Sequence, residues 1–221
     1  MIGWLKKYTT QGLRDAIKNV MLEARFCRLH LDGVRNARRY QGQKQLKLHL
    51  GAGPNIKQGF INIDLSNKAD LTLNLYEPLP FESGCCAMVY SEHFLEHVEY
   101  PDTTRSFLGE CFRVLDAGGV ISVGVPDSEW PVRAYAGDAE YAEWFQKVRE
   151  YGYPAWCKTR MECVNYSFRQ GREHRFAYDF ETLKGALESV GFADVKRRAF
   201  NPALDSKLRE YSTLYVEAVK P

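Results

Sequence analysis

The sequence predicts an α/β fold built around a mostly parallel sheet, and three observations support this prediction. The 221 residues, 45% of them hydrophobic, are enough for one domain with a sizeable core. After residue 44, short apolar runs alternate with helical stretches, as in a sheet whose strands are joined by crossover helices. A glycine-rich turn follows the first apolar run directly, at the carboxyl end where open α/β sheets bind their ligands.

Before this alternation, residues 1–40 are predicted to form a basic, amphipathic helical segment, and residues 41–221 the domain itself. Residues 1–47 hold eleven Lys and Arg against three Asp and Glu, whereas the remainder holds nineteen against twenty-five. The helix either packs on the fold with its charges in water, or contacts an anionic membrane surface, an acidic substrate or nucleic acid. Apolar residues at helical spacing are Leu13, Ile17, Val20, Ala24, Cys27 and Leu31, and the basic stripe beside them is Arg14, Lys18, Arg25 and Arg28.

Seven segments of the domain are predicted to be strands. A helix with the apolar face 107–115 precedes the fifth strand and stops before Gly118, and Asp179 can cap a second helix that extends to about Val190. The predicted strands lie near 46–50, 60–64, 70–75, 87–91, 120–125, 194–200 and 212–219.

The segment 127–178 interrupts the alternation. It is rich in aromatic and charged residues and contains one helix-like piece from Asp138 to Tyr151. We therefore expect an insertion that covers the site of the domain, and not a separate domain.

The glycine turn and the end of the second strand suggest an adenosine-containing ligand. The first strand runs into Gly51-Ala52-Gly53, and the second ends at Asp64. Such a turn lets the backbone approach a cofactor, and a carboxylate at the end of the next strand can accept both hydroxyls of a ribose. A dinucleotide fingerprint would have a third glycine where Ile56 stands and a helix facing a pyrophosphate. S-adenosylmethionine (SAM) has no phosphate and suits the turn better.

At this point a family resemblance becomes specific. Between residues 46 and 200, the chain resembles the class I, type-11-like SAM-dependent methyltransferases in the order of its motifs. The resemblance implies a Rossmann-like, seven-stranded, mostly parallel sheet with an antiparallel last strand, and SAM as the cofactor. The motifs are LHLGAGP, FINIDLS, LPF, VYSEHFLEHV, RVLDAGGVISVGVPD and DFETLKGALESVGF.

On the first two strands, the resemblance implies that Gly51, Ala52 and Gly53 line the methionine and ribose portions of SAM. Asp64 would hold the ribose hydroxyls.

On the next two strands, Asn74 and Leu75 fall where the family often has an Asp followed by an apolar residue at the adenine. An amide oxygen can still accept a hydrogen bond from the adenine amino group. Ala87 stands where the family usually has Asp. Ser91 and His93 are expected beside the cofactor, at the carboxyl end of the fourth strand.

The expected reaction is an in-line displacement at the sulfonium methyl, in which the enzyme chiefly aligns the reactants. The preferred acceptor is a hydroxyl of a small molecule or glycan, rather than an amine or carbon. Because a hydroxyl is a poor nucleophile, the enzyme then needs a base. The candidate bases are His93, Asp127 and His174. Alternatively, Asp127 only caps the following helix and His174 is an exposed loop residue. The nearby Arg169, Arg172 and Arg175 are interpreted as a solvated loop rather than an anion clamp.

Two rival functions remain open. His93, Glu96 and His97 match the HxxEH pattern of zinc hydrolases, and in a helix the two histidines would share one face. Because the pattern directly follows a strand and belongs to the family motif, we expect no metal, and we interpret Glu96 and His97 as polar groups at a helix start. The other rival is a SAM-binding protein without turnover.

Composition also bears on location and partners. No apolar run reaches 18 residues, and Lys6 and Lys7 precede no small-residue cleavage site. A cytoplasmic protein is therefore expected, with peripheral contact to an anionic membrane through residues 1–40 as an alternative.

The six cysteines form no CxxC pair and are expected to be reduced. The basic excess lies on one helix without the stacking aromatics of an RNA-binding module, which argues against nucleic acid.

Overall fold

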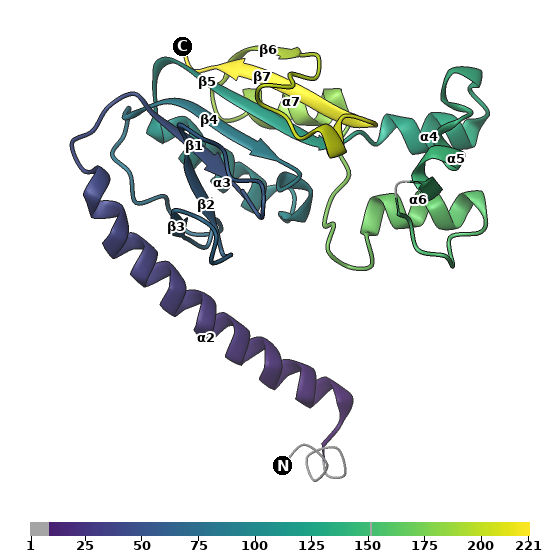
Figure 1. The fold of residues 1–221 in the computed structure, drawn as a ribbon, viewed down its shortest axis with the longest axis horizontal. Helices are drawn as coiled ribbons and strands as arrows, with labels where there is room; N and C mark the ends of the chain where they lie inside the picture. The colour runs from purple at the N-terminus through teal and green to yellow at the C-terminus, as the bar shows by residue number, and fades with distance from the viewer. Residues whose placement is uncertain (1–8, 151) are drawn as a thin grey trace.

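The computed structural model describes residues 9–150 and 152–221 (Figure 1). Within them, seven strands form one sheet in the order β3-β2-β1-β4-β5-β7-β6. Strands β1 to β5 pair in parallel, whereas β7 is antiparallel to both β5 and β6. The Rossmann-like sheet with an antiparallel last strand is thus confirmed. The strands are β1 (Leu46–Leu50), β2 (Ile61–Asp64), β3 (Leu71–Thr72), β4 (Cys86–Glu92), β5 (Leu115–Pro126), β6 (Ala193–Arg197) and β7 (Thr213–Val219).

Two predicted helices of the domain are present. The helix before β5 is confirmed, and Asp179 caps the later one by accepting a hydrogen bond from the Thr182 N–H at 2.8 Å. The expected single helix from Asp138 to Tyr151 is wrong, because Asp138 caps only a short 3₁₀ turn before α5 begins, and Tyr151 lies outside the described residues. The α-helices are α2 (Gln11–Ala37), α3 (Asp102–Val114), α4 (Glu129–Ala136), α5 (Trp144–Glu150), α6 (Arg160–Arg169) and α7 (Phe180–Glu188).

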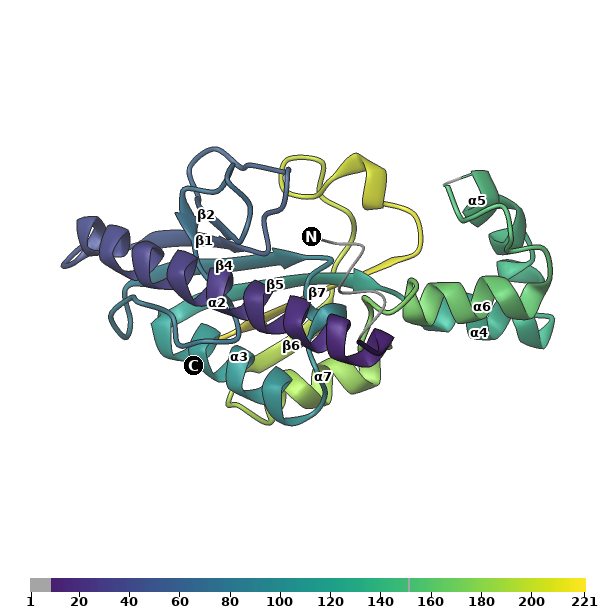
Figure 2. The same cartoon turned by 90° about the horizontal axis from the view of Figure 1, so that it is seen from below.

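The two faces of the sheet are covered differently. Helices α3 and α7 lie on one face, over the apolar side chains that alternate along β1, β4 and β5 (Figure 2). The opposite face carries buried polar residues and is covered by the loops 51–60 and 198–212. There, the Tyr90 hydroxyl donates to Asp205, and Lys57 reaches the carbonyl of Leu204.

Helix α2 is present as expected, but its apolar stripe does not pack on the fold. Its buried residues are Gly33 and Ala37, near its C-terminal end, and a Cβ at Gly33 would collide with the carbonyl of Thr72. Leu13 and Val20 in the stripe are 50% and 70% exposed. Figure 1 shows α2 running away from the sheet toward its N-terminus. Residues 1–8 of the predicted segment lie outside the described residues, and none of the described helices is long and apolar enough to cross a membrane.

Helices α4, α5 and α6 form a helical lobe beside the sheet (Figures 1 and 2). The chain leaves the sheet at Asp127 and returns at Tyr178, and these two residues pair in an isolated parallel bridge. The Ser128 N–H also donates to the Tyr178 carbonyl at 2.9 Å. The lobe has its own apolar cluster, made of Ala134, Trp144, Phe145, Val148, Cys157, Cys163 and Val164.

Candidate active site

The glycine turn after β1 has the backbone that its sequence suggests. Gly51 and Gly53 both have left-handed φ angles, 72° and 51°. A Cβ at Gly51 would lie 2.6 Å from the Cβ of Phe94, whereas a Cβ at Gly53 would meet nothing within 4 Å. Gly51 is therefore required by two independent constraints, its backbone conformation and the closeness of Phe94. Beside Gly53 there is open space.

Asp64 lies directly against this turn. Its two carboxylate oxygens accept hydrogen bonds from the N–H of Gly53 at 3.0 Å and of Ser66 at 2.7 Å. The turn is further fixed because the N–H groups of Gly51 and Ala52 donate to the carbonyl of Ile63. The structure thus brings together the four residues predicted for the methionine and ribose portions, and Ala52 among them is buried.

Asn74 and Leu75 follow β3, at the same edge of the sheet, because Thr72 pairs with Asp64 in the parallel ladder. Leu75 is buried, and the Asn74 side-chain oxygen accepts from the N–H of Tyr76 at 3.1 Å. That oxygen retains a second lone pair, so the bond does not prevent it from binding a further donor.

Ser91 and His93 occupy the end of β4. Ser91 is buried, and its hydroxyl oxygen has no hydrogen-bond partner among the described residues. His93 has a left-handed φ of 54°, and only the short 3₁₀ helix η2 (Leu95–His97) follows it. A helix that would place His93 and His97 on one face is therefore absent, in contrast to the arrangement needed for a helical HxxEH zinc site.

A cavity of about 290 Å³ opens between the carboxyl ends of the strands and the helical lobe. Its lining includes all three residues predicted to be catalytic, His93, Asp127 and His174. The lobe and the loop before β7 contribute Trp144, Val148, Tyr153, Tyr166, Gln170 and Tyr211.

Both ring nitrogens of His93 lie near a polar side chain, and Nε2 is the one within hydrogen-bond distance. Its Nε2 lies 2.9 Å from the hydroxyl of Thr213, and its Nδ1 lies 3.5 Å from a carboxylate oxygen of Glu96. Burial, with a smaller contribution from Arg209, lowers the pKa of His93 to about 3. The imidazole is therefore neutral at neutral pH.

Asp127 uses both carboxylate oxygens. One accepts from the N–H of Glu129 in the first turn of α4 at 3.0 Å, and the other lies 3.5 Å from Nη1 of Arg197. Burial raises the pKa of Asp127. These contacts agree with the capping role that the sequence left open.

His174 is half-buried, so the alternative of an exposed loop residue is wrong. Its Nδ1 lies 3.0 Å from the carbonyl of Ser167 and must donate there, because a carbonyl can only accept. Nε2 of the neutral ring then carries a lone pair. Burial, followed by the nearby His97, lowers the pKa of His174. The three neighbouring arginines, Arg169, Arg172 and Arg175, are exposed.

The sequence interpretation missed Glu96 as a site residue. Its side chain is 2% exposed, and neither carboxylate oxygen has a hydrogen-bond partner among the described residues. Burial raises the pKa of Glu96 to about 8. The HxxEH pattern was the available signal, although the structure uses these residues differently from a zinc hydrolase helix.

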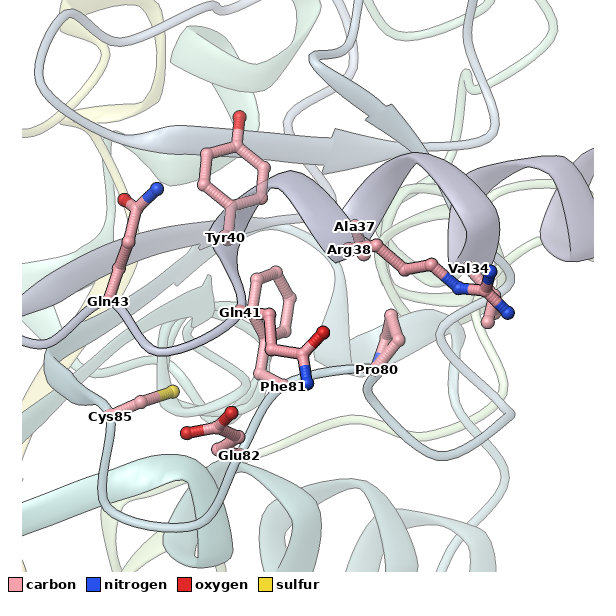
Figure 3. Close-up of a pocket in the computed structure, with 10 residues that line it drawn as sticks. All are labelled: Val34, Ala37, Arg38, Tyr40, Gln41, Gln43, Pro80, Phe81, Glu82 and Cys85. Atoms are coloured by element: carbon pink, nitrogen blue, oxygen red, sulfur yellow. The ribbon is translucent and has the colours of Figure 1, made fainter.

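A second cavity, of about 300 Å³, lies between the end of α2 and residues 80–85 (Figure 3). Arg38, Tyr40, Phe81 and Cys85 are among the residues that line it. Because Cys85 directly precedes β4, this cavity is at the amino end of the strands, away from the edge that carries the predicted site residues.

Comparison with known proteins agrees with this geometry. Residues 53–123 match the model of a family described as a methyltransferase domain, and no curated protein matches the chain in sequence. A SAM-dependent methyltransferase from Archaeoglobus fulgidus is 17% identical, with a TM-score of 0.50 over 85% of this chain and 92% of its own.

Two further solved structures are similar. A possible exported protein from Bordetella parapertussis is 16% identical, with 87% of this chain and 67% of its own covered and a TM-score of 0.49. A possible histamine N-methyltransferase from Thermotoga maritima is 17% identical, with 98% of both chains covered and a TM-score of 0.45.

The chain thus has the fold of the class I SAM-dependent methyltransferases, and its residues 53–123 are similar to a methyltransferase domain. A methyltransferase domain implies a methyl acceptor, and SAM is the methyl donor that this fold implies.

Proposed function

We propose that this methyltransferase transfers the methyl group to a hydroxyl of a small molecule or glycan, bound in the cavity between the sheet and the lobe. The observation that carries the proposal is that one cavity is lined by His93, Asp127 and His174 at the carboxyl end of the strands. SAM, when bound, supplies an electrophilic methyl on its sulfonium. The protein then has to align the acceptor oxygen and take up its proton.

On the cofactor side, we assign SAM to the turn Gly51–Gly53, with Asp64 at the ribose hydroxyls and Asn74 and Leu75 at the adenine. The residues fit this ligand, because the space beside Gly53 is open and Asp64 borders it. The unpartnered hydroxyl of Ser91 also fits a polar ligand atom at the end of β4.

Among the candidate bases, His174 fits the role best. Its Nδ1–H is fixed on the carbonyl of Ser167, which leaves Nε2 free to accept a proton. In contrast, the pKa of His93 is too low for a strong base, and both oxygens of Asp127 are engaged. His93 remains the second candidate, because it lies at the end of β4 where the cofactor is expected.

The segment 127–178 is proposed to act as an insertion that covers the acceptor. Its two ends meet at the bridge between Asp127 and Tyr178, so the lobe can be held beside the sheet without interrupting it. Trp144, Tyr153 and Tyr166 line the cavity and offer flat surfaces of the kind that pack against a sugar ring or another flat acceptor.

The experiment that tests this proposal is turnover with a panel of hydroxyl acceptors, small molecules and glycans, for the parent, His174→Ala and His93→Ala. Loss of the base should lower the rate by roughly 10²–10⁴-fold with little change in SAM affinity, measured separately by calorimetry. His30→Ala, on α2, is the matched control and should turn over like the parent. Parent-like rates in both site variants would contradict the base assignment, and methylation of amines alone would contradict the acceptor class.

For the N-terminal segment we propose peripheral contact with an anionic membrane surface. The specific observation is that the apolar stripe of α2 is exposed beside its basic stripe, whereas the packed face is the one with Gly33 and Ala37. Flotation with vesicles that contain anionic lipid should carry the full chain and not a variant lacking residues 1–40.

A second variant changes only the basic stripe and keeps the contact at Gly33. Replacing Arg14, Lys18, Arg25 and Arg28 with Gln should abolish flotation while SAM affinity stays unchanged. Equal flotation of this variant and the parent, or equal flotation on neutral vesicles, would contradict an electrostatic membrane contact.

A further inference from the structure

Three potential metal ligands converge beside the acceptor cavity, from segments far apart in the sequence. Glu96 and His97 belong to η2, and His174 lies just after α6. The N–H groups of Arg175 and Phe176 both donate to the carbonyl of Glu96, at 2.7 and 3.2 Å, and so tie the two segments together. One ligand atom of each of the three side chains lies within 4.8 Å of the others.

The two imidazoles are oriented as metal ligands usually are. Nδ1 of His97 lies 3.0 Å from the carbonyl of Glu173, and Nδ1 of His174 lies 3.0 Å from that of Ser167. Each Nδ1–H must donate to its carbonyl, so each neutral ring keeps an unprotonated Nε2. A ligating histidine typically has its second nitrogen fixed on a backbone carbonyl in this way.

Glu96 supplies the third ligand. Both of its oxygens are buried without a hydrogen-bond partner among the described residues. One of the oxygens lies 3.5 Å from Nδ1 of His93 and 3.9 Å from Nε2 of His97. A buried carboxyl with no partner is costly, and binding of either a proton or a cation would relieve that cost.

We propose that Glu96, His97 and His174 bind one divalent transition-metal ion, with zinc as the best match. Two imidazoles and one carboxylate form a set of ligands that zinc favours, with a fourth position left for water or substrate. Ligand atoms about 2.0–2.2 Å from a zinc ion are roughly 3.3–3.6 Å apart in a tetrahedron. The side chains therefore need to close in by about an ångström.

This site differs from the helical HxxEH arrangement, because His174 takes the place of His93. His174 also lines the acceptor cavity, so the open position of the metal can face an acceptor oxygen. When the metal is bound, Nε2 of His174 is occupied, so metal binding and the role of His174 as the base exclude each other in one and the same state of the protein. The metal site itself stands independently of methyl transfer, since it rests on the three side chains alone.

Metal binding is tested with the full chain, treated with a chelator, dialysed, and titrated with Zn²⁺ in the absence of SAM and acceptor. We expect one zinc per chain and a rise in Tm. His97→Gln and His174→Gln should each weaken zinc binding at least tenfold. His30→Gln, a histidine on α2, is the matched control and should bind like the parent.

Glu96→Gln, which keeps size and removes the charge, provides a second measurement should a histidine variant not fold. It should weaken zinc binding by a similar factor, and Co²⁺ should give the intense visible bands of a tetrahedral site in the parent and lose them in this variant. No zinc retained by the parent, or unchanged binding in the Glu96 and histidine variants, would overturn the proposal. Because no cofactor is present in these measurements, the result is separate from the outcome of the turnover assays.

Discussion

The two sides of the site at the carboxyl edge of the sheet are built on different principles. On the glycine side, around Gly51 and Asp64, the polar groups are paired within a short stretch of chain. On the histidine side, Glu96 and Ser91 are buried with oxygens that have no partner among the described residues. The glycine side therefore has its hydrogen bonds complete without a ligand, whereas the histidine side keeps buried oxygens that can still bind a ligand atom, a proton or a cation.

The largest effect is expected from Gly51→Ala. The left-handed backbone costs an alanine about 1–2 kcal/mol, and overpacking against Phe94 adds about 1–3 kcal/mol. The free energy of unfolding, measured by urea denaturation, should fall by the sum of the two. Gly53→Ala is the matched control, because its φ is also positive but its Cβ would meet open space, and it should cost only the first amount. Equal losses in both variants would show that Phe94 does not constrain the turn.

Asp64→Ala tests whether the paired carboxylate also serves the ligand. Loss of hydrogen bonds from the ribose to a charged acceptor should cost about 1.5–3 kcal/mol, roughly a 10–150-fold weaker affinity for S-adenosylhomocysteine by calorimetry. Asp70→Ala is the control, since Asp70 accepts two hydrogen bonds from Asn62 at 2.8 Å without bordering the turn. That variant should lose stability but keep its affinity. Unchanged affinity in Asp64→Ala would remove Asp64 from the cofactor site.

A smaller, pH-dependent effect is expected from His49 on β1, which pairs with Asn62 at 3.0 Å. Burial lowers its pKa from 6.5 to about 4, so the folded state resists protonation. Its contribution to stability is complete above pH 6.5 and is lost as the pH falls toward 4, by about 1.4 kcal/mol per pH unit.

His49→Gln removes this titration. Between pH 6.5 and 4, the free energy of unfolding of the parent should therefore fall more steeply than that of the variant. Parallel pH profiles would mean that His49 is protonated as readily in the folded as in the unfolded chain.

The same contrast explains what the sequence could predict. The glycine side depends on a turn and a strand end thirteen residues apart, so local patterns were enough to pair Gly51 with Asp64. The histidine side depends on the contact of η2 with residues 174–176, which no local pattern encodes. His93 and His174 were expected in the site for their chemistry. Glu96 was interpreted as a polar group at a helix start, because its burial without a hydrogen-bond partner is a tertiary property that the sequence does not show.

The lobe was predicted as an insertion with one helix-like piece, so its three α-helices were not foreseen. Its helix α6 does begin with a readable signal, the capping box in which Thr159 and Glu162 bond each other's backbone N–H groups. Helix α4 begins where the chain leaves the sheet; Ser128 makes no side-chain cap there, and it is the carboxylate of Asp127 that accepts from the N–H of Glu129, in the capping role that the sequence left open. For α2, the helical spacing of its apolar residues predicted the helix correctly. That spacing alone does not tell which face of the helix packs against the fold.

The exposure of most of helix α2 has a consequence for hydrogen exchange. Isolated helices are marginal in water, and the first part of α2 has no buried residue before Gly33. Backbone amides near its N-terminal end should therefore exchange with solvent much faster than those near Ala37, which are protected by the sheet. Any surface that covers the exposed stripe would slow this exchange and extend the protection toward Gln11. The exchange rates of the amides along α2 would therefore report whether the stripe is covered.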